Sequence, residues 1–456
     1  MDAAPIAPPS RRGLIVGLLL CVVAIAFEAT AVVTAMPAAV ADLGDLDLYA
    51  WAFTGFVIAQ TLSIVASGQA SDRFGPVRPL FAGFVVFGVG LALAGAATSM
   101  GWLVAARTIQ GLGGGTMNLA VMVLVGRAFD GRERASLMTA FSAAWMVPAF
   151  AGPPLAAWLA ETWSWHWVFW SVLPVLLLAA LLVTRPLLRL SQPLPDAAVH
   201  TPRRHLAMAL LVAAGAASVQ WAGQRIEPSS LAWLLLGLAL LAGGLPPLMP
   251  AGFSPIGAGL SAVVNVRALT SGAFFGAQTF LPLMVTQAWG LSLQWAAVIM
   301  IVGSLGWMTG AWLQSQSWLR WRRDTIIVIG AASTTVGLVA VAVATLLPAS
   351  GTGVVMAGWA GCGLGMGLSN ASTSLAVMQL SPAVALGRNT SSLQVGEALG
   401  NSLCAGLAGT LYVLGSGWPR PGAAFGALMA AMAMTAGLAV SASKRIGPVE
   451  NHSVSL

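Results

Sequence analysis

Long apolar runs alternate with short polar segments along almost the whole chain. A helix that crosses a bilayer needs roughly 20 apolar residues at about 1.5 Å rise per residue, and the runs have about this length. The pattern therefore predicts fourteen membrane-spanning helices. The runs are Gly13–Val40, Ala50–Gly68, Pro79–Thr98, Trp102–Ala128, Leu137–Ala160, Trp165–Leu182, Leu206–Gly223, Leu231–Leu245, Leu269–Ala288, Leu293–Leu313, Thr325–Leu347, Val354–Val377, Ser391–Leu414 and Gly422–Ala442. Without the short pair between 206 and 245, the chain would have twelve spans in the same orientation.

A glycine-rich motif occurs twice in the chain. Gly111–Asn118 (GLGGGTMN) and Gly363–Asn370 (GLGMGLSN) share five identities in eight positions and lie in the fourth and twelfth runs. The loops that follow them, Gly131–Leu137 and Gly387–Leu393, also align. Chance matching between glycine-rich runs is the alternative. We interpret the match as a duplication of six spans, because alternating-access transporters are built from such repeated halves.

The spans and the repeat together predict an all-α polytopic membrane protein with two six-helix bundles and an inserted hairpin. Arg11 and Arg12 precede the first run as in a signal peptide, but the run is too long for one, so we expect an uncleaved span. The predicted segments are a cytoplasmic tail (1–12), an N-terminal bundle (13–184), a cytoplasmic linker (185–205), a two-helix hairpin (206–250), a C-terminal bundle (251–443) and a second cytoplasmic tail (444–456).

Composition and charge place the chain in a membrane with a definite orientation. Of the 456 residues, 58% are hydrophobic and only 8% are charged, whereas soluble domains carry about a quarter charged residues. The net charge of +7 does not indicate nucleic-acid binding, since the basic residues are spread among loops. With the N-terminus inside, 18 of the 21 Lys and Arg residues fall in inner segments, including Arg267 in the loop before Leu269. We therefore expect both termini in the cytoplasm of a plasma-membrane protein.

Three charged residues inside the predicted spans are the main candidates for function: Glu28, Arg107 and Glu397. Each costs roughly 3 kcal/mol at the centre of a membrane helix, which favours a functional role. Because burial disfavours the ionised carboxylate, Glu28 is a candidate for binding and releasing protons, or for binding a cationic substrate in competition with them. Arg107 would bias the protonation of that carboxylate by its proximity, or would donate hydrogen bonds to backbone carbonyls between helices. Glu397 could instead be an interfacial residue near the cytoplasm.

A charged, glycine-containing turn separates the second and third runs. Its sequence is GQASDRFGPVRPL, from Gly68 to Leu80. We expect Gly68 to end one helix, Gly75 to allow the reversal, and Asp72 to lie at a helix N-terminus, where the dipole favours a carboxylate. The turn is either a solvated hairpin whose arginines, Arg73 and Arg78, orient the chain, or a polar latch between moving helices.

Four motifs resemble signatures of the major facilitator superfamily, and within it of the fourteen-span drug–proton antiporter branch. They are Gly68-x-x-x-Asp72-Arg73-x-Gly75 with Arg78 between the second and third spans, Arg107-Thr-Ile-Gln110-Gly111 in the fourth, Pro148-x-x-x-Gly152-Pro153-Pro154 in the fifth, and Trp165-His-Trp-x-Phe169 in the sixth. The resemblance covers nearly the whole chain. It implies a cytoplasmic gate at the first motif and antiport at the third, although an ordinary kinked membrane helix also fits the third.

The sequence thus predicts a secondary active transporter that exports small lipophilic or cationic compounds, driven by inward proton flow. No G-x-x-x-x-G-K-[ST] phosphate loop occurs and Lys444 is the only lysine, so ATP-driven transport is not expected. We expect no cofactor, no metal, no nucleic-acid partner and a monomer. The alternatives are an exporter or facilitator of a specific lipid or metabolite and, more distantly, an intramembrane enzyme, for which no catalytic cluster lies at membrane depth.

Overall fold

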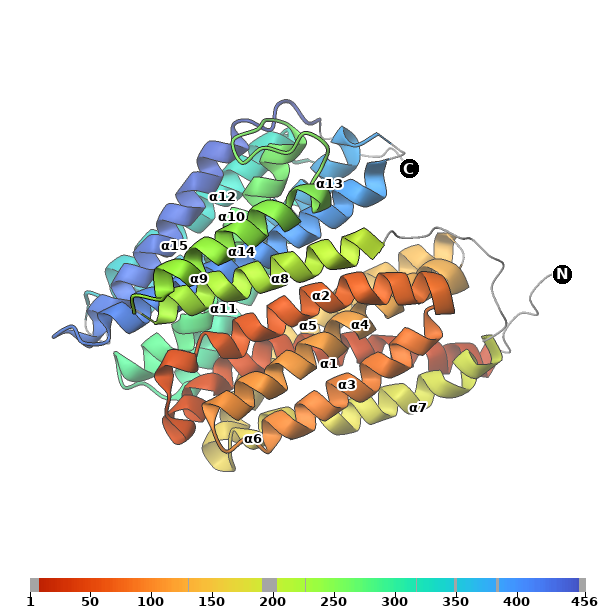
Figure 1. The fold of residues 1–456 in the computed structure, drawn as a ribbon, viewed down its shortest axis with the longest axis horizontal. Coiled ribbons are helices and arrows are strands. Elements are labelled where there is room, and N and C mark those ends of the chain that lie inside the picture. The colour runs from red at the N-terminus through yellow and green to blue at the C-terminus, as the bar shows by residue number, and fades with distance from the viewer. Residues whose placement is uncertain are drawn as a thin grey trace. The chain divides into compact units, whose positions relative to one another are not determined.

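The computed structural model describes residues 8–129, 131–190, 203–225, 227–316, 318–347, 351–382 and 385–450. The predicted tails 1–12 and 444–456 and the predicted linker 185–205 lie partly outside these ranges. Within them all regular structure is helical, and Figure 1 shows the long helices as coiled ribbons. An all-helical chain is what a bilayer requires, because a helix satisfies its own backbone hydrogen bonds.

The helices match the predicted runs closely. Their bounds are α1 (Pro8–Leu43), α2 (Trp51–Phe74), α3 (Val77–Gly95), α4 (Met100–Ala128), α5 (Gly131–Thr162), α6 (His166–Trp170), α7 (Val172–Leu190), α8 (Arg203–Gln224), α9 (Ser230–Gly244), α10 (Leu260–Gln287), α11 (Leu293–Ser315), α12 (Arg323–Ala344), α13 (Thr352–Leu380), α14 (Leu386–Gly415) and α15 (Pro421–Ser443). The predicted sixth span is divided into α6 and α7 at Ser171.

Thirteen stretches of the described chain are long and apolar enough to cross a membrane, one fewer than the fourteen predicted. Each of the thirteen overlaps a predicted run. The remaining run falls on α13, which has 29 residues but is not among the thirteen. Glycines and small polar residues make up much of α13 and lower its hydropathy. The helix is long enough to cross a membrane, and its many small residues allow neighbouring helices to pack closely against it.

The chain divides into two compact units. The first holds the described residues up to Leu48 and from Gly55 to Leu206, and the second holds Tyr49–Thr54 and Ala207 onwards, so α9 and all of α8 from Ala207 on belong to the second unit. In the first unit α1 packs against α5 and α7, and α3 packs against α4. In the second, α10 packs against α14 and α15, and α12 packs against α13. The same order of pairings in both units supports a duplication.

The glycine-rich repeat has the same packing role in both units. On α4, added Cβ atoms at Gly111 and Gly115 would overlap backbone oxygens of α2, and one at Gly113 would overlap Phe87 of α3. The three positions therefore face two neighbouring helices in turn. Small residues let membrane helices approach closely, since the bilayer supplies no hydrophobic force between them.

On α13 the aligned glycines do the same. Gly363 and Gly367 lie against backbone oxygens of α11, and Gly365 lies against Gly330 and Thr334 of α12. The helices α11 and α12 stand in the second unit where α2 and α3 stand in the first. The sequence identities thus preserve contacts, which chance similarity between glycine-rich runs would not do.

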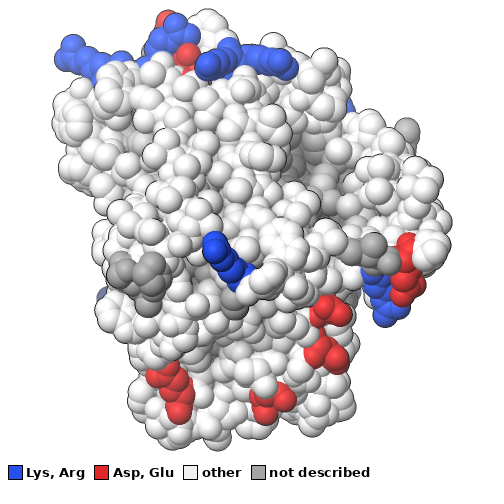
Figure 2. All heavy atoms as spheres, turned by 90° about the vertical axis from the view of Figure 1, so that its left-hand side faces the viewer, with Lys and Arg blue, Asp and Glu red and all other residues white. Residues whose placement is uncertain are grey.

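Apolar side chains cover much of the surface that surrounds these bundles. Val85, Leu181, Val336 and Met434 are each more than 60% exposed, and they come from α3, α7, α12 and α15. Figure 2 shows a face on which charged side chains form a few separate groups and most of the surface belongs to other residues. Such a surface is costly in water and stable against lipid.

Candidate functional site

Glu28 and Arg107 form a buried ion pair in the first unit. Glu28 lies in the middle of α1 and Arg107 in the second turn of α4, and their side chains meet through Oε1 and Nη1. Glu28 is 1% exposed and Arg107 is 3% exposed. Two opposite charges stabilise each other strongly away from water, whereas either one alone would be very costly there. The two residues predicted from their positions inside spans are therefore partners.

Two further contacts hold the Arg107 guanidinium. Its Nη1 donates a hydrogen bond of 2.7 Å to Gln110 Oε1, and its Cζ lies 4.4 Å from the centre of the Phe56 ring. A Cβ at Gly111 would overlap the Phe56 carbonyl oxygen, so this glycine lets α2 bring its ring over the arginine. The fourth-span motif thus supplies the cation, its hydrogen-bond partner and the space for an aromatic face.

The fifth-span motif packs on α1 two residues beyond Glu28. Thr30 Oγ1 donates a hydrogen bond of 3.1 Å to the Pro148 carbonyl oxygen. A Cβ at Gly152 would lie 2.6 Å from the same hydroxyl, so only glycine leaves room for it. Pro148 and Pro153 both lie inside α5, where proline removes backbone donors. The motif therefore fixes where α5 meets the helix that carries Glu28.

The turn between the second and third spans is shorter than predicted. α2 continues past Gly68 to Phe74, and α3 begins at Val77. The predictions that Gly68 ends a helix and that Asp72 lies at a helix N-terminus are wrong, because Asp72 lies in the last turn of α2. The expectation for Gly75 is confirmed by its φ of 75°, in the left-handed region that glycine adopts without strain.

The charged side chains of this turn are exposed. The guanidinium groups of Arg73 and Arg78 lie 5.1 Å and 5.9 Å from the centre of the Phe74 ring, so one aromatic ring serves both arginines. Gly68 instead faces α4, where a Cβ would lie 3.4 Å from Leu119. The latch role stays a prediction.

The second unit contains a partly buried ion pair that the sequence did not predict. Arg267 Nε lies 2.9 Å from Glu397 Oε2, and Ser271 Oγ donates a hydrogen bond of 3.1 Å to the other carboxylate oxygen. The apolar runs predict that Arg267 lies in a cytoplasmic loop. It lies instead inside α10, which begins at Leu260, and it is 8% exposed. Glu397 on α14 therefore has a cationic partner inside its own bundle.

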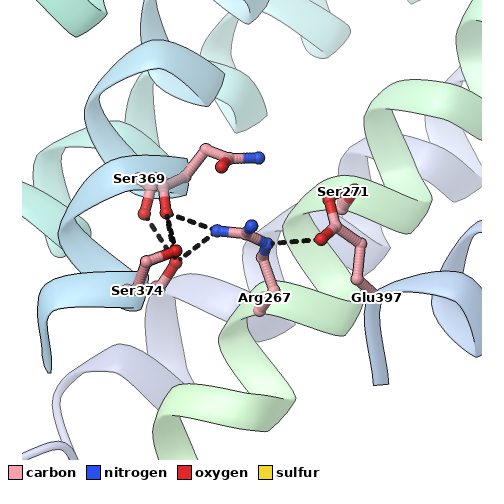
Figure 3. A network of polar contacts seen from close by, with 7 residues as sticks. Arg267, Ser271, Ser369, Ser374 and Glu397 are labelled. Carbon is pink, nitrogen blue, oxygen red and sulfur yellow. Dashed lines mark hydrogen bonds and ion pairs between the residues drawn. The ribbon is translucent and has the colours of Figure 1, made fainter. Parts of the chain in front are cut away.

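Arg267 also contacts α13. Its Nη1 donates hydrogen bonds to the Asn370 carbonyl oxygen and, at 2.7 Å, to Thr373 Oγ1. Figure 3 shows the guanidinium group between the α13 side chains and Glu397. One cation thus links three helices of the second unit, α10, α13 and α14. A sequence signal did exist, because Arg267 stands only two residues before the predicted start of its span.

The paired groups offer proton binding and ionic contacts. Among the described residues no group of three or more His, Cys, Asp and Glu side chains could hold a metal ion. Of the three predicted membrane charges, Glu28 and Arg107 are brought together, and Glu397 is paired with Arg267. One buried and one partly buried carboxylate–guanidinium pair are therefore the candidate functional groups.

Comparison with known proteins identifies the family. The model of the family described as the Major Facilitator Superfamily matches residues 18–336, which is more than half of the chain. The chain belongs to the Major Facilitator Superfamily. Members of this superfamily are membrane transporters of small molecules rather than enzymes, and the thirteen span candidates of the described chain fit a multi-pass membrane protein.

Several relatives from this superfamily are similar to part of the chain. The multidrug transporter protein MdtP of Bacillus subtilis is 33% identical over 39% of the chain, and multidrug resistance protein 3 of the same organism is 32% identical over 41%. The acurin A biosynthesis cluster MFS-type transporter of Aspergillus aculeatus is 33% identical over 52%. The chain spans 33%, 36% and 46% of the length of these three relatives.

A solved structure shows the same superfamily fold. A bacterial homologue of the human lysosomal transporter Spinster, crystallised in an inward-facing and occupied conformation, superposes with a TM-score of 0.63. The match covers 97% of each chain at 14% sequence identity. The fold class predicted from the sequence is thereby confirmed.

Proposed function

We propose that this transporter is a proton-coupled antiporter that exports small lipophilic compounds by alternating access. The observation that carries the proposal is the buried pair of Glu28 and Arg107. A carboxylate held at membrane depth can bind and release a proton, and in such a position a functional role is the default interpretation. The distant relationship to multidrug transporters supports the substrate class.

The contacts of Arg107 support an exchange step at Glu28. When a proton neutralises the carboxylate, the guanidinium loses its anionic partner but keeps Gln110 and the Phe56 ring. When the carboxylate is ionised, a cationic substrate can take the place of Arg107 beside it, and Arg107 again keeps its other two contacts. Proton and substrate then compete for one carboxylate, which is sufficient for coupled exchange.

The remaining assignments complete the proposal. The chain works as a monomer in the plasma membrane with both termini in the cytoplasm, as the distribution of Lys and Arg indicates. The segment with Asp72, Arg73 and Arg78 forms a cytoplasmic gate. Glu397 is a second coupling carboxylate, and its ion pair with Arg267 supports this role.

One observation favours a second candidate function. The relative that covers the largest share of the chain among those named above is the transporter of a biosynthesis cluster for a single compound, acurin A. Export of a specific metabolite by the same fold is therefore the alternative. It would keep the Glu28–Arg107 pair and replace broad selectivity with a single substrate.

Transport in sealed vesicles of purified protein tests the main proposal. We would impose a pH gradient, follow a fluorescent lipophilic cation, and compare the native chain with Glu28→Gln and with Asp47→Asn, whose carboxylate is exposed. Gradient-driven movement should occur in the native chain and in Asp47→Asn and should be lost in a folded Glu28→Gln protein. Movement in all three would overturn the role of Glu28, and movement in none would overturn the substrate class.

A further inference from the structure

A groove in the second unit shares no residue with either ion pair. Its volume is about 560 Å³, within the ~300–1,000 Å³ range of small-molecule pockets, and side chains of α8, α9 and α14 line it. The large lining residues are apolar: Leu231, Leu234, Leu403 and Leu407. No charged residue is among those that line it. A ligand of this groove must therefore be uncharged and lipophilic.

One polar side chain at the wall of the groove has no partner. Gln220 on α8 lines the groove and is 4% exposed, and its amide packs against Gly406 of α14. Neither Oε1 nor Nε2 makes a hydrogen bond with any residue in the part of the chain that the structure describes, and both atoms are covered by protein, so the side chain has to turn before its amide can meet a ligand in the groove. A buried amide without a partner is costly, and it is more so in a membrane helix, where water does not replace the partner.

The groove is reached from the side of the inserted hairpin. Among the described residues of α9, only Gly237 and Gly244 are buried, while Leu231, Leu235 and Leu238 are more than half exposed. Such a helix presents apolar side chains to lipid. A molecule dissolved in the bilayer can thus approach the leucines of the groove without crossing a polar surface.

We infer that this groove binds an uncharged lipophilic molecule that carries an amide or a similar group with both a donor and an acceptor. The apolar walls hold the hydrocarbon part, and the carboxamide of Gln220, once its side chain turns toward the groove, pairs with the polar group through its own donor and acceptor. The site belongs to the hairpin and α14, so it does not depend on proton coupling at Glu28.

Photolabelling with a matched pair of probes tests this inference. One probe is a long-chain fatty amide with a diazirine in its chain, and the other is the same diazirine-bearing hydrocarbon without the amide. In purified full-length protein in nanodiscs, the amide probe should label peptides of α8, α9 and α14 at lower concentrations than the hydrocarbon. Gln220→Leu keeps a similar volume and removes the amide, so it should lower amide labelling about tenfold and leave hydrocarbon labelling unchanged.

A second variant keeps the test decisive if Gln220→Leu does not fold. Leu234→Trp places a larger ring in the groove and should reduce labelling by both probes there. Equal amide labelling of native protein and Gln220→Leu would overturn the inference, as would labelling spread over helices that do not line the groove. Displacement of the amide probe by ordinary bilayer phospholipid alone would instead assign the groove to a structural lipid and would also overturn it.

Discussion

Arg267 on α10 and Glu397 on α14 form an ion pair in the second unit, and the first unit has an ion pair between a different combination of helices. In the first unit the carboxylate of Glu28 is on the first helix, α1, and the cation, Arg107, is on α4. In the second unit the cation is on the first helix, α10, and the carboxylate is on α14. The glycine contacts thus recur at matching positions of the two units, whereas the ion pairs do not.

Breaking the Arg267–Glu397 pair on one side should destabilise the protein. Arg267→Met leaves the partly buried Glu397 without its cation, so the loss should lie between the about 0–1 kcal/mol of an exposed pair and the about 3–5 kcal/mol of a fully buried one. The double variant Arg267→Met with Glu397→Met should recover much of this loss, because no charge stays unpaired. The measurement is the free energy of unfolding in detergent titrations.

The pair Arg322–Asp324 provides the matched control. Its atoms are 3.0 Å apart, but the arginine side chain is 52% exposed. An exposed pair contributes only about 0–1 kcal/mol, so Arg322→Met should change the free energy of unfolding very little. Equal losses for Arg267→Met and Arg322→Met would show that burial of the first pair does not matter for stability.

A lysine at position 107 should not support transport in place of the native arginine. A lysine side chain carries a point charge and cannot keep Glu28, Gln110 and the Phe56 ring together in the geometry of a planar guanidinium. We expect Arg107→Lys to reduce gradient-driven transport at least about tenfold, while the exposed Arg420→Lys leaves it unchanged. Initial rates in sealed vesicles measure both. A fully active Arg107→Lys protein would contradict the assigned role.

The glycines of α13 should differ in their tolerance of alanine. In Gly365→Ala the added Cβ would overlap atoms of Gly330 and Thr334, and overpacking of this kind costs about 1–3 kcal/mol. In Gly353→Ala on the same helix the Cβ meets open space, so stability should be unchanged or slightly higher. Thermal unfolding of the two purified variants compares them directly, and similar melting temperatures would argue against close packing of α12 and α13.

Cysteine labelling should report the orientation of the chain. The native cysteines Cys21, Cys362 and Cys404 are buried, so they give little background with a water-soluble maleimide. If both termini are cytoplasmic, Asp47→Cys should react with an impermeant maleimide in intact cells. Arg78→Cys should react only after the cells are permeabilised. The reverse result would invert the topology.

Much of the fold could be predicted from the apolar runs, because the length and composition of a run are enough to identify a membrane helix. The Glu28–Arg107 pair was partly foreseen for a related reason, since a charge in the middle of an apolar run is rare and costly. The position of Asp72 was not predicted correctly, because the glycine at position 68 was interpreted as the end of a helix. In a membrane helix glycine packs against a neighbour, and only the chain reversal at Gly75 ends α2.

Arg267 shows where sequence reasoning fails. The polar residues Asn265 and Arg267 interrupt the start of α10, so the apolar run begins nine residues after the helix does, at Leu269 instead of Leu260. What makes a buried arginine tolerable is Glu397, 130 residues further along the chain. No local pattern records a partner at that distance, whereas a three-dimensional structure shows it at once.

The glycine-rich composition of α13 has a consequence for biogenesis. Glycines add little apolar surface, so α13 gains more from close contact with particular neighbouring helices than from contact with lipid. The neighbours that its glycines fit, α11 and α12, precede it in the chain and leave the ribosome first. We therefore expect the translocon to retain these two helices until α13 emerges. The residues that pack the finished bundle would then also set the order in which it is assembled.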